Sequence, residues 1–217
     1  MSTDPMTFRK PAFWARSETR LAAILFVVLV AVNVFLNPLR FWPGNWPAVL
    51  GLAAPLLLAT LATTLPFLAG RGSIDVSVGP LMGLINVILV KVLISDAGIS
   101  SPWIIVPAAL LLGLASGALN GLLAAILRIQ PIVATLATYL IYSGLALSIL
   151  PSPSGSVPAW LSGLAGPMSI LPVGLVAVLW LAFRRLPLYE QLMAVGSDDR
   201  AAYTAGVNVP AIRFLSY

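Results

Sequence analysis

The sequence predicts an all-α fold, a polytopic bundle of transmembrane helices. Three observations lead to this prediction: six long apolar runs divide the chain, few residues are charged, and the basic residues gather on one side of the runs. Of the 217 residues, 59% are hydrophobic and 9% are charged, whereas soluble domains contain about 25% charged residues. The composition therefore excludes an ordinary soluble domain.

The apolar runs are long enough to cross a membrane. They cover residues 21–39, 48–69, 78–95, 103–127, 131–150 and 168–183. A helix that crosses about 30 Å of hydrocarbon needs about 20 residues, and most of the runs approach or exceed that length. We therefore predict three parts, an N-terminal segment at 1–20, a transmembrane bundle of about six spans at 21–183, and a polar segment at 184–217.

The distribution of Lys and Arg predicts the orientation. If the chain crosses the membrane at each run, ten of its 12 basic residues fall on the same side: Arg9, Lys10, Arg16, Arg20, Arg71, Arg128, Arg184, Arg185, Arg200 and Arg213. The positive-inside rule identifies that side as cytoplasmic, so segments 1–20 and 184–217 are expected in the cytoplasm. The net charge of +5 is then explained by contact with a lipid surface, and nucleic acid is not expected as a partner.

Several kinds of chemistry are excluded by what the chain lacks. It contains no cysteine and no histidine, which excludes disulfides, thiol catalysis and the common histidine metal sites. It also lacks the G-x-x-x-x-G-K-[ST] phosphate loop. We expect no catalytic residue, no metal site and no cofactor.

Polar residues inside the spans are candidates for a function. Asn86 lies in the third run, and Ser116 and Asn120 lie four residues apart in the fourth. A buried amide needs a partner, so both asparagines should face the bundle or a wet cavity, where they either bond another helix or contact a ligand. The fourth run also carries glycines four residues apart, at Gly113, Gly117 and Gly121, which favour close approach by another helix.

The segment between the second and third runs allows two interpretations. It is polar and bracketed by glycines, Gly72 and Gly79, and the residues from Pro80 to Ser95 are too few for a full crossing. It is either an interrupted segment that lines a transport path or an ordinary loop followed by a helix that starts at a proline. Asp75 could cap that helix or bind substrate.

A short helix is expected within the polar C-terminal segment. Residues 197–206 (SDDRAAYTAG) begin with Ser and Asp, which cap helices, and end with glycine. Taken alone, this helix is either a docking element or a connector.

Three segments, in the same order, resemble the permease subunits of ribose-type ATP-binding-cassette (ABC) importers of monosaccharides. Residues 72–79 (GSIDVSVG) are similar to the family's G-G-I-D-L-S-V-G. Residues 120–123 (NGLL) and 128–136 (RIQPIVATL) resemble N-G-L-L and R-v-P-P-F-I-v-T-L. Residues 194–208 (AVGSDDRAAYTAGVN) resemble A-V-G-G-N-x-x-A-A-x-x-S-G-I-N. The resemblance extends from about residue 48 to residue 217.

The resemblance implies a type II-like permease of about ten spans in the bacterial inner membrane. Its implied partners are a cytoplasmic ABC ATPase, which hydrolyses the ATP, a second permease copy or paralogue, a periplasmic sugar-binding protein and membrane lipid. The loop after the sixth span would hold a coupling helix that docks on the ATPase. The residues carried over to that contact are Gly196, Asp198, Asp199, Ala201, Ala202 and Gly206. The residues assigned to the translocation path or its motifs are Asp75, Ser77, Gly79, Asn86, Asn120 and Thr135.

Departures from the family pattern bear on the substrate and on docking. They are Ser73 for Gly, Pro80 for a small polar residue, Ser197 for Gly, Asp198 for Asn and Ala205 for Ser. The chain also stops where the family would begin its seventh span, so we expect a bundle that is incomplete at the C-terminus. The resemblance leaves the sugar open, whether ribose-, xylose- or galactose-like.

Two other classes of function compete with this one. An ion-coupled secondary transporter would need titratable groups deep in the bundle. Asp75 and Lys91 are the charged residues expected nearest to the membrane interior. The third class is a membrane assembly or regulatory protein that transports nothing.

Overall fold

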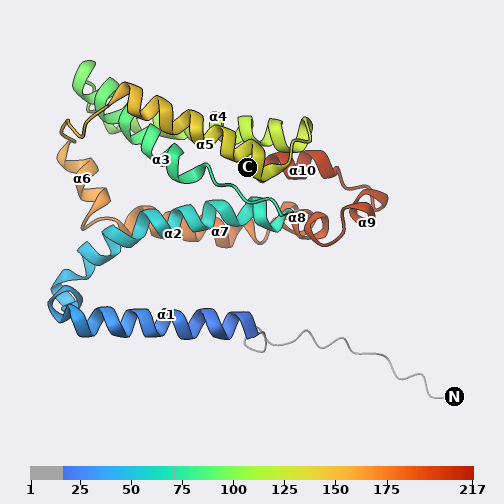
Figure 1. The fold of residues 1–217 in the computed structure, drawn as a ribbon, viewed down its shortest axis with the longest axis horizontal. Helices are drawn as coiled ribbons and strands as arrows, with labels where there is room; N and C mark the ends of the chain where they lie inside the picture. Colours follow the sequence, from blue (N-terminus) through green and yellow to red (C-terminus); the bar gives the residue numbers. More distant parts are fainter. Residues whose placement is uncertain (1–16, 71) are drawn as a thin grey trace. The chain divides into compact units, whose positions relative to one another are not determined.

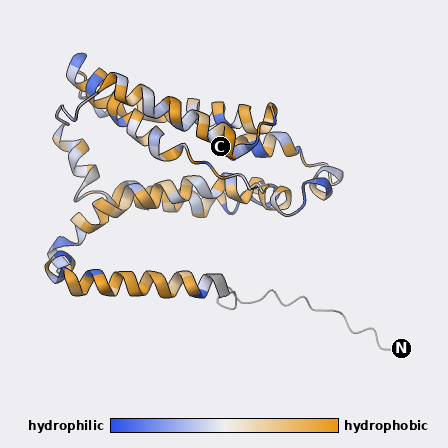
Figure 2. Ribbon diagram, in the orientation of Figure 1, coloured by the Kyte–Doolittle hydropathy of each residue, from blue (hydrophilic) through white to orange (hydrophobic). Residues whose placement is uncertain are grey.

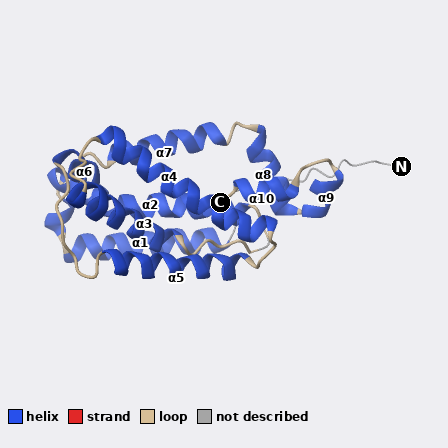
Figure 3. Cartoon of the chain, turned by 90° about the horizontal axis from the view of Figure 1, so that it is seen from above, coloured by secondary structure: helices blue, strands red, loops and turns tan. Residues whose placement is uncertain are grey.

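The computed structural model describes residues 17–70 and 72–217, and every regular element within these ranges is a helix (Figure 3). The predicted all-α fold is therefore confirmed. Residues 1–16, most of the predicted N-terminal segment 1–20, lie outside the described residues. The chain forms two compact units, residues 1–49 and 50–217.

The first unit contains one long apolar helix. Helix α1 (Ser17–Leu36) is followed by two short 3-10 turns, η2 (Pro38–Phe41) and η3 (Pro43–Asn45), and by the start of α2 (Trp46–Leu68). No residue in the apolar stretch of α1 is buried within the chain, and Figure 2 shows hydrophobic residues along most of the helix. Such a helix is stable where lipid or another protein covers it.

The second unit contains the remaining helices. They are the rest of α2, α3 (Val78–Val87) continued by the π-helical η4 (Ile88–Asp96), α4 (Pro102–Gly121) continued by the π-helical η5 (Leu122–Ile126), α5 (Pro131–Ile149), α6 (Ala159–Ala165), α7 (Ile170–Phe183), α8 (Pro187–Ser197), α9 (Asp199–Thr204) and α10 (Val209–Leu215). Proline occupies the first turn of α4, α5, α8 and α10, where its missing N–H has no intrahelical partner to lose.

Five of the predicted spans are helices long and apolar enough to cross a membrane. The third is continuous from Val78 to Asp96, so this helix is not interrupted, and it begins two residues before Pro80. The assignment of the segment before it to a transport path stays a prediction. The sixth run is shorter than predicted. It forms only the 14 residues of α7, about 21 Å of helix, and the chain then bends by 77° into α8. Two arginines and Pro187 follow α7 directly, which explains why the apolar helix ends there.

Helices α3, α4 and α5 pack together, and α10 lies against the end of α4 (Figure 1). The glycines predicted to admit a close neighbour do so at two of the three positions. A Cβ on Gly121 would lie 2.8 Å from the carbonyl oxygen of Phe214, and one on Gly117 would meet the backbone of Tyr217. Gly113 has nothing within 4 Å. The surface of α4 around Gly117 and Gly121 is therefore covered by the end of the polar C-terminal segment.

A small hydrophobic core joins α2 to the C-terminal segment. Its buried residues are Ala69, Leu192, Val195, Ala202, Val209 and Ile212. The backbones also approach closely here, because a Cβ on Gly196 would overlap the carbonyl oxygen of Leu68. Helices α8 to α10 are thus packed against the membrane helices and do not form a separate domain.

This approach predicts that Gly196→Ala is destabilising. The added methyl group has no room against the α2 backbone, and such overpacking costs about 1–3 kcal/mol. Gly174→Ala is the matched control, since Gly174 lies in helix α7 with nothing within 4 Å. Thermal unfolding in detergent should show a lower Tm for Gly196→Ala alone. Equal Tm values for the two variants would contradict the close packing.

Candidate functional site

Four buried polar side chains of the second unit form a hydrogen-bonded network with Asp75, here called the Asn120 network. It joins the non-helical segment 73–77 to α4 and α5. Its members are Asp75, Ser77, Asn120, Thr135 and Thr138, with the backbone of Ile74 and Val76. All of its side chains except that of Asp75 are buried.

Asn120 is the centre of this network. Its side chain is 1% exposed. The amide nitrogen donates to Ser77 Oγ at 2.8 Å and, over a longer distance of 3.5 Å, to Asp75 Oδ2. The amide oxygen accepts from Thr138 Oγ1 at 2.9 Å. One amide therefore holds three segments together, as a polar group at membrane depth must if it is to be stable there.

Asp75 organises the chain just before α3. Its Oδ1 accepts from the backbone N–H of Ser77 at 2.8 Å and from Ser77 Oγ at 2.7 Å. The N-cap residue of α3 is Ser77, so Asp75 binds the N-cap residue and does not itself cap the first turn. The carboxylate thus shapes a turn that delivers Ser77 to Asn120.

Helix α5 fixes the same segment from the other side. Thr135 Oγ1 donates to the carbonyl of Ile74 at 3.2 Å and accepts from the N–H of Val76 at 3.3 Å. Since this segment makes no regular helix, the threonine hydroxyl replaces one of its missing backbone partners.

Two predicted residues lie apart from this network. Asn86 is exposed on α3, and Gly79 is exposed at the start of that helix. Asp75, Ser77, Asn120 and Thr135 are brought together, whereas the assignment of Gly79 and Asn86 to a translocation path stays a prediction.

Two further residues, Thr138 and Tyr142, belong to this site although they were not predicted. Thr135, Thr138 and Tyr142 recur at helical spacing and form a polar stripe on α5. This stripe faces the Ser116–Asn120 pair of α4, with Ser116 Oγ 2.7 Å from the Tyr142 hydroxyl. The periodicity of the stripe was the signal that could have revealed it.

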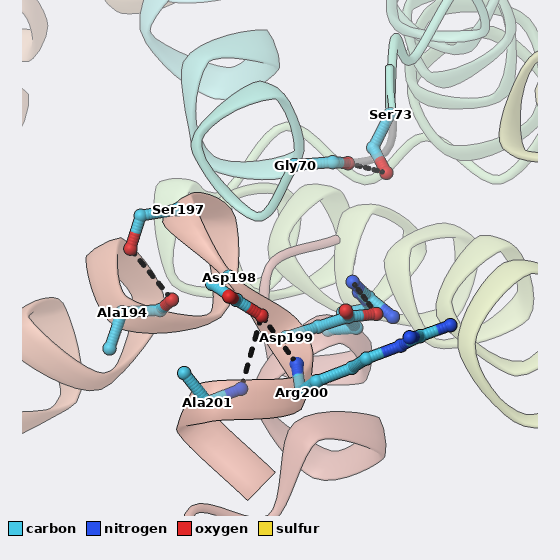
Figure 4. Close-up of polar contacts among 9 residues, drawn as sticks. Gly70, Ser73, Ala194, Ser197, Asp198, Asp199, Arg200 and Ala201 are labelled. Atoms are coloured by element: carbon cyan, nitrogen blue, oxygen red, sulfur yellow. Dashed lines mark hydrogen bonds and ion pairs between the residues drawn. The ribbon is translucent and has the colours of Figure 1, made fainter.

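The predicted coupling segment forms a capped helix. Asp198 Oδ1 accepts from the N–H groups of Arg200 at 2.9 Å and Ala201 at 3.1 Å (Figure 4). Gly206 follows α9 with φ +86°, a conformation that favours glycine. Asp199 forms an ion pair of 3.2 Å with Arg213 of α10. The first turn of the short helix is thus held by the Asp198 cap and by the Asp199–Arg213 ion pair.

The six residues assigned to ATPase coupling differ in exposure. Ala202 is buried in the small core, and Gly196, although exposed, lies against α2. Asp198, Ala201 and Gly206 are exposed, and Asp199 is half-buried. Only part of the predicted set is therefore accessible to another protein.

Ionisable groups are few around the network. Burial raises the pKa of the Tyr217 hydroxyl, an effect that the Ser73 side chain opposes and the Asp75 charge reinforces. Lys91, in η4, forms an ion pair with Asp96. Within the described ranges, no three Asp or Glu side chains gather at a place that could hold a metal ion.

Comparison with known proteins gives the family. Residues 46–217 match the family described as branched-chain amino acid transport system / permease component. This chain belongs to that permease family. The permease also has relatives across nearly its whole length, and no solved structure matches it significantly.

The relatives are transport proteins. The galactofuranose transporter permease protein YtfT of Escherichia coli K12 is 34% identical over 99% of this chain and 65% of its own length. The autoinducer 2 import system permease protein LsrC of E. coli is 34% identical over 92% of this chain and 57% of its own. The probable ABC transporter permease protein y4mJ of Sinorhizobium fredii is 26% identical over 93% and 61%. The chain thus spans 57–65% of the length of these permeases.

The resemblance to permeases of sugar importers is therefore confirmed. The relatives are permease subunits and not enzymes, as predicted for this chain.

The network predicts unequal effects of two asparagine substitutions. Asn120→Ala removes the hydrogen bonds that join α4 to Ser77 and Thr138 and leaves these two residues only their local partners. It should lower the free energy of unfolding by about 0.5–2 kcal/mol, the range measured for hydrogen bonds between membrane helices. Asn86→Ala is the control on an exposed position of α3. Unfolding in mixed detergent and denaturant measures both, and an equal loss in the two variants would argue against the network.

Proposed function

We propose that this chain is part of the permease subunit of an ATP-driven ABC importer that moves a monosaccharide across the bacterial inner membrane. The observation that carries the proposal is the 34% identity to the galactofuranose transporter permease over 99% of the chain. The proposed partners are a cytoplasmic ABC ATPase, a second permease copy or paralogue, a periplasmic sugar-binding protein and the surrounding lipid. The chain contains no phosphate loop, so the ATPase subunit hydrolyses the ATP.

The ATPase binds the exposed face of α9 in this proposal. Asp198, Ala201 and Gly206 supply the accessible part of the contact, because each is exposed. Gly196 and Ala202 fix the position of α9 indirectly, because Gly196 packs against α2 and Ala202 lies in the small core. Orientation follows from the same assignment, since the ATPase is cytoplasmic and α9 must face it.

Movement of α9 is transmitted to the membrane helices through two contacts. The first is the core that joins Ala202 to Ala69 at the end of α2. The second is formed by α10, which packs on Gly121 of α4, and by Tyr217 after it, which packs on Gly117. Asn120 lies next to Gly121, so a shift of α10 along α4 acts directly on the Asn120 network.

The support for a sugar as substrate comes from the relatives. The galactofuranose transporter permease is 34% identical over 99% of this chain. The groups of the Asn120 network are bonded to one another, and all but Asp75 are buried. The network therefore stabilises the bundle and carries no argument about the substrate.

Ion-coupled transport is less well supported. It requires a titratable group inside the bundle that is available to an ion. Lys91 is partly exposed and paired, and Asp75 is engaged by Ser77. Uptake that persists on a proton gradient without the ATPase would favour this alternative.

The docking assignment predicts that Ala201→Glu abolishes the ATPase activity coupled to transport. The substitution adds a bulky charge to the exposed face of α9 without entering the core. The assembled importer should keep its permease at normal abundance but lose stimulation of ATP hydrolysis by the loaded binding protein.

Ala159→Glu is the matched control, at an exposed alanine of α6, on the loop predicted to lie outside the cell. It should leave stimulation unchanged. Full stimulation in an intact Ala201→Glu importer would overturn the assignment of α9 to the ATPase contact.

A further inference from the structure

A cavity of about 630 Å³ lies between the turn that joins η5 to α5 and the pair α9–α10. All of its walls belong to the second unit. Its polar lining includes Arg128 and Gln130 from the turn, Arg200 and Thr204 from α9, and Arg213 and Tyr217 from α10 and the residues that follow it. The cavity is lined neither by the side chains of the Asn120 network nor by the α9 residues proposed to contact the ATPase, so it is a separate feature.

The cavity carries a positive charge. Among the side chains that line it, three guanidinium groups face one carboxylate, that of Asp199, which gives a net side-chain charge of +2 (three minus one). The carboxylate forms its ion pair with Arg213. Neither Arg128 nor Arg200 has an ion-pair partner in the part of the chain that the structure describes. Two guanidinium groups are thus available to an anion.

A buried donor on the cavity wall also lacks a partner. Within the described residues, Arg213 Nε makes no hydrogen bond, and the Arg213 side chain lines the cavity. Burying a donor without an acceptor is unfavourable, and an anionic oxygen placed in the cavity would accept from it.

The backbone at Arg128 is strained. Its φ of +59° is left-handed, and Arg128 is the only non-glycine residue of the described ranges in that conformation. Such a conformation is unfavourable for a residue with a side chain and is common at functional sites. Here it accompanies a guanidinium at the mouth of the cavity.

We propose that this cavity binds a phosphate group, carried either by the headgroup of an anionic lipid or by a small soluble phosphate. Arginine is suited to phosphate because its planar guanidinium donates two parallel hydrogen bonds. The volume is within the usual range of small-molecule sites, about 300–1,000 Å³, and leaves room for more than the phosphate itself. Ala124, Ala125 and Ile129 supply apolar wall for the rest of the ligand.

Binding to the purified chain, freed of native lipid in detergent, tests this proposal. The probes are a short-chain phosphatidylglycerol, the matching phosphatidylcholine, and inorganic phosphate, and the readout is the bound fraction by native mass spectrometry. Binding of phosphatidylglycerol alone identifies an anionic lipid headgroup. Binding of inorganic phosphate as well identifies a soluble phosphate.

The double variant Arg128→Gln/Arg200→Gln should bind about tenfold or more weakly to whichever phosphate-containing probe the unaltered chain binds. Such a loss is expected when charge-assisted hydrogen bonds are removed. Arg184→Gln/Arg185→Gln removes the same charge from the turn between α7 and α8, outside the cavity, and should leave binding unchanged. Arg213 is kept because it pairs with Asp199.

Three results would overturn the proposal: no probe binds, both double variants lose binding equally, or phosphatidylcholine binds as well as phosphatidylglycerol. In the first case an acidic side chain of a protein partner becomes the better candidate for the cavity. The measurement needs neither ATPase nor substrate, so its failure leaves the proposed transport function untouched.

Discussion

The hydrogen bonds of the Asn120 side chain are the constraint on which the second unit depends. Its amide lies where water is excluded, and it must therefore be satisfied by protein groups. Ser77 and Thr138 satisfy it, and in doing so they tie the irregular segment before α3 to α4 and α5. A segment without helical hydrogen bonds is tolerated at this depth because Asp75 and Thr135 bond its backbone.

Two close backbone approaches connect this network to the polar end of the chain. Gly196 rests on the end of α2, and Gly121 and Gly117 admit α10 and Tyr217 after it onto α4. These contacts require glycine because the neighbouring atoms belong to backbone, which has little freedom to move aside. Helices α8 to α10 and the polar network are therefore parts of one packed body, as the proposed coupling to an ATPase requires.

The sequence predicted the helices well because apolar runs of membrane length have few alternative structures. It also selected Asp75, Ser77, Asn120 and Thr135, since polar residues in apolar surroundings are conspicuous and the family motifs contain them. The sequence did not reveal which helix faces meet. Asn86 and Asn120 look alike as residues, yet only Asn120 faces polar groups on neighbouring segments. For the same reason Thr138 and Tyr142 were missed, and Ala202 was assigned to a surface although it is buried in the core.

The account requires α9 and the loop before α6 to lie on opposite sides of the membrane, and Figure 1 places α6 and α9 at opposite ends of the second unit. The chain contains no cysteine, so one introduced cysteine is the only residue of the chain that a maleimide labels, and its labelling shows on which side of the membrane it lies. The most direct measurement is labelling of Ser154→Cys and Thr204→Cys in intact cells with a maleimide that does not cross the inner membrane; both positions are exposed. The account predicts that position 154 is labelled at once and position 204 only after the cells are opened. Labelling of position 204 in intact cells would contradict it.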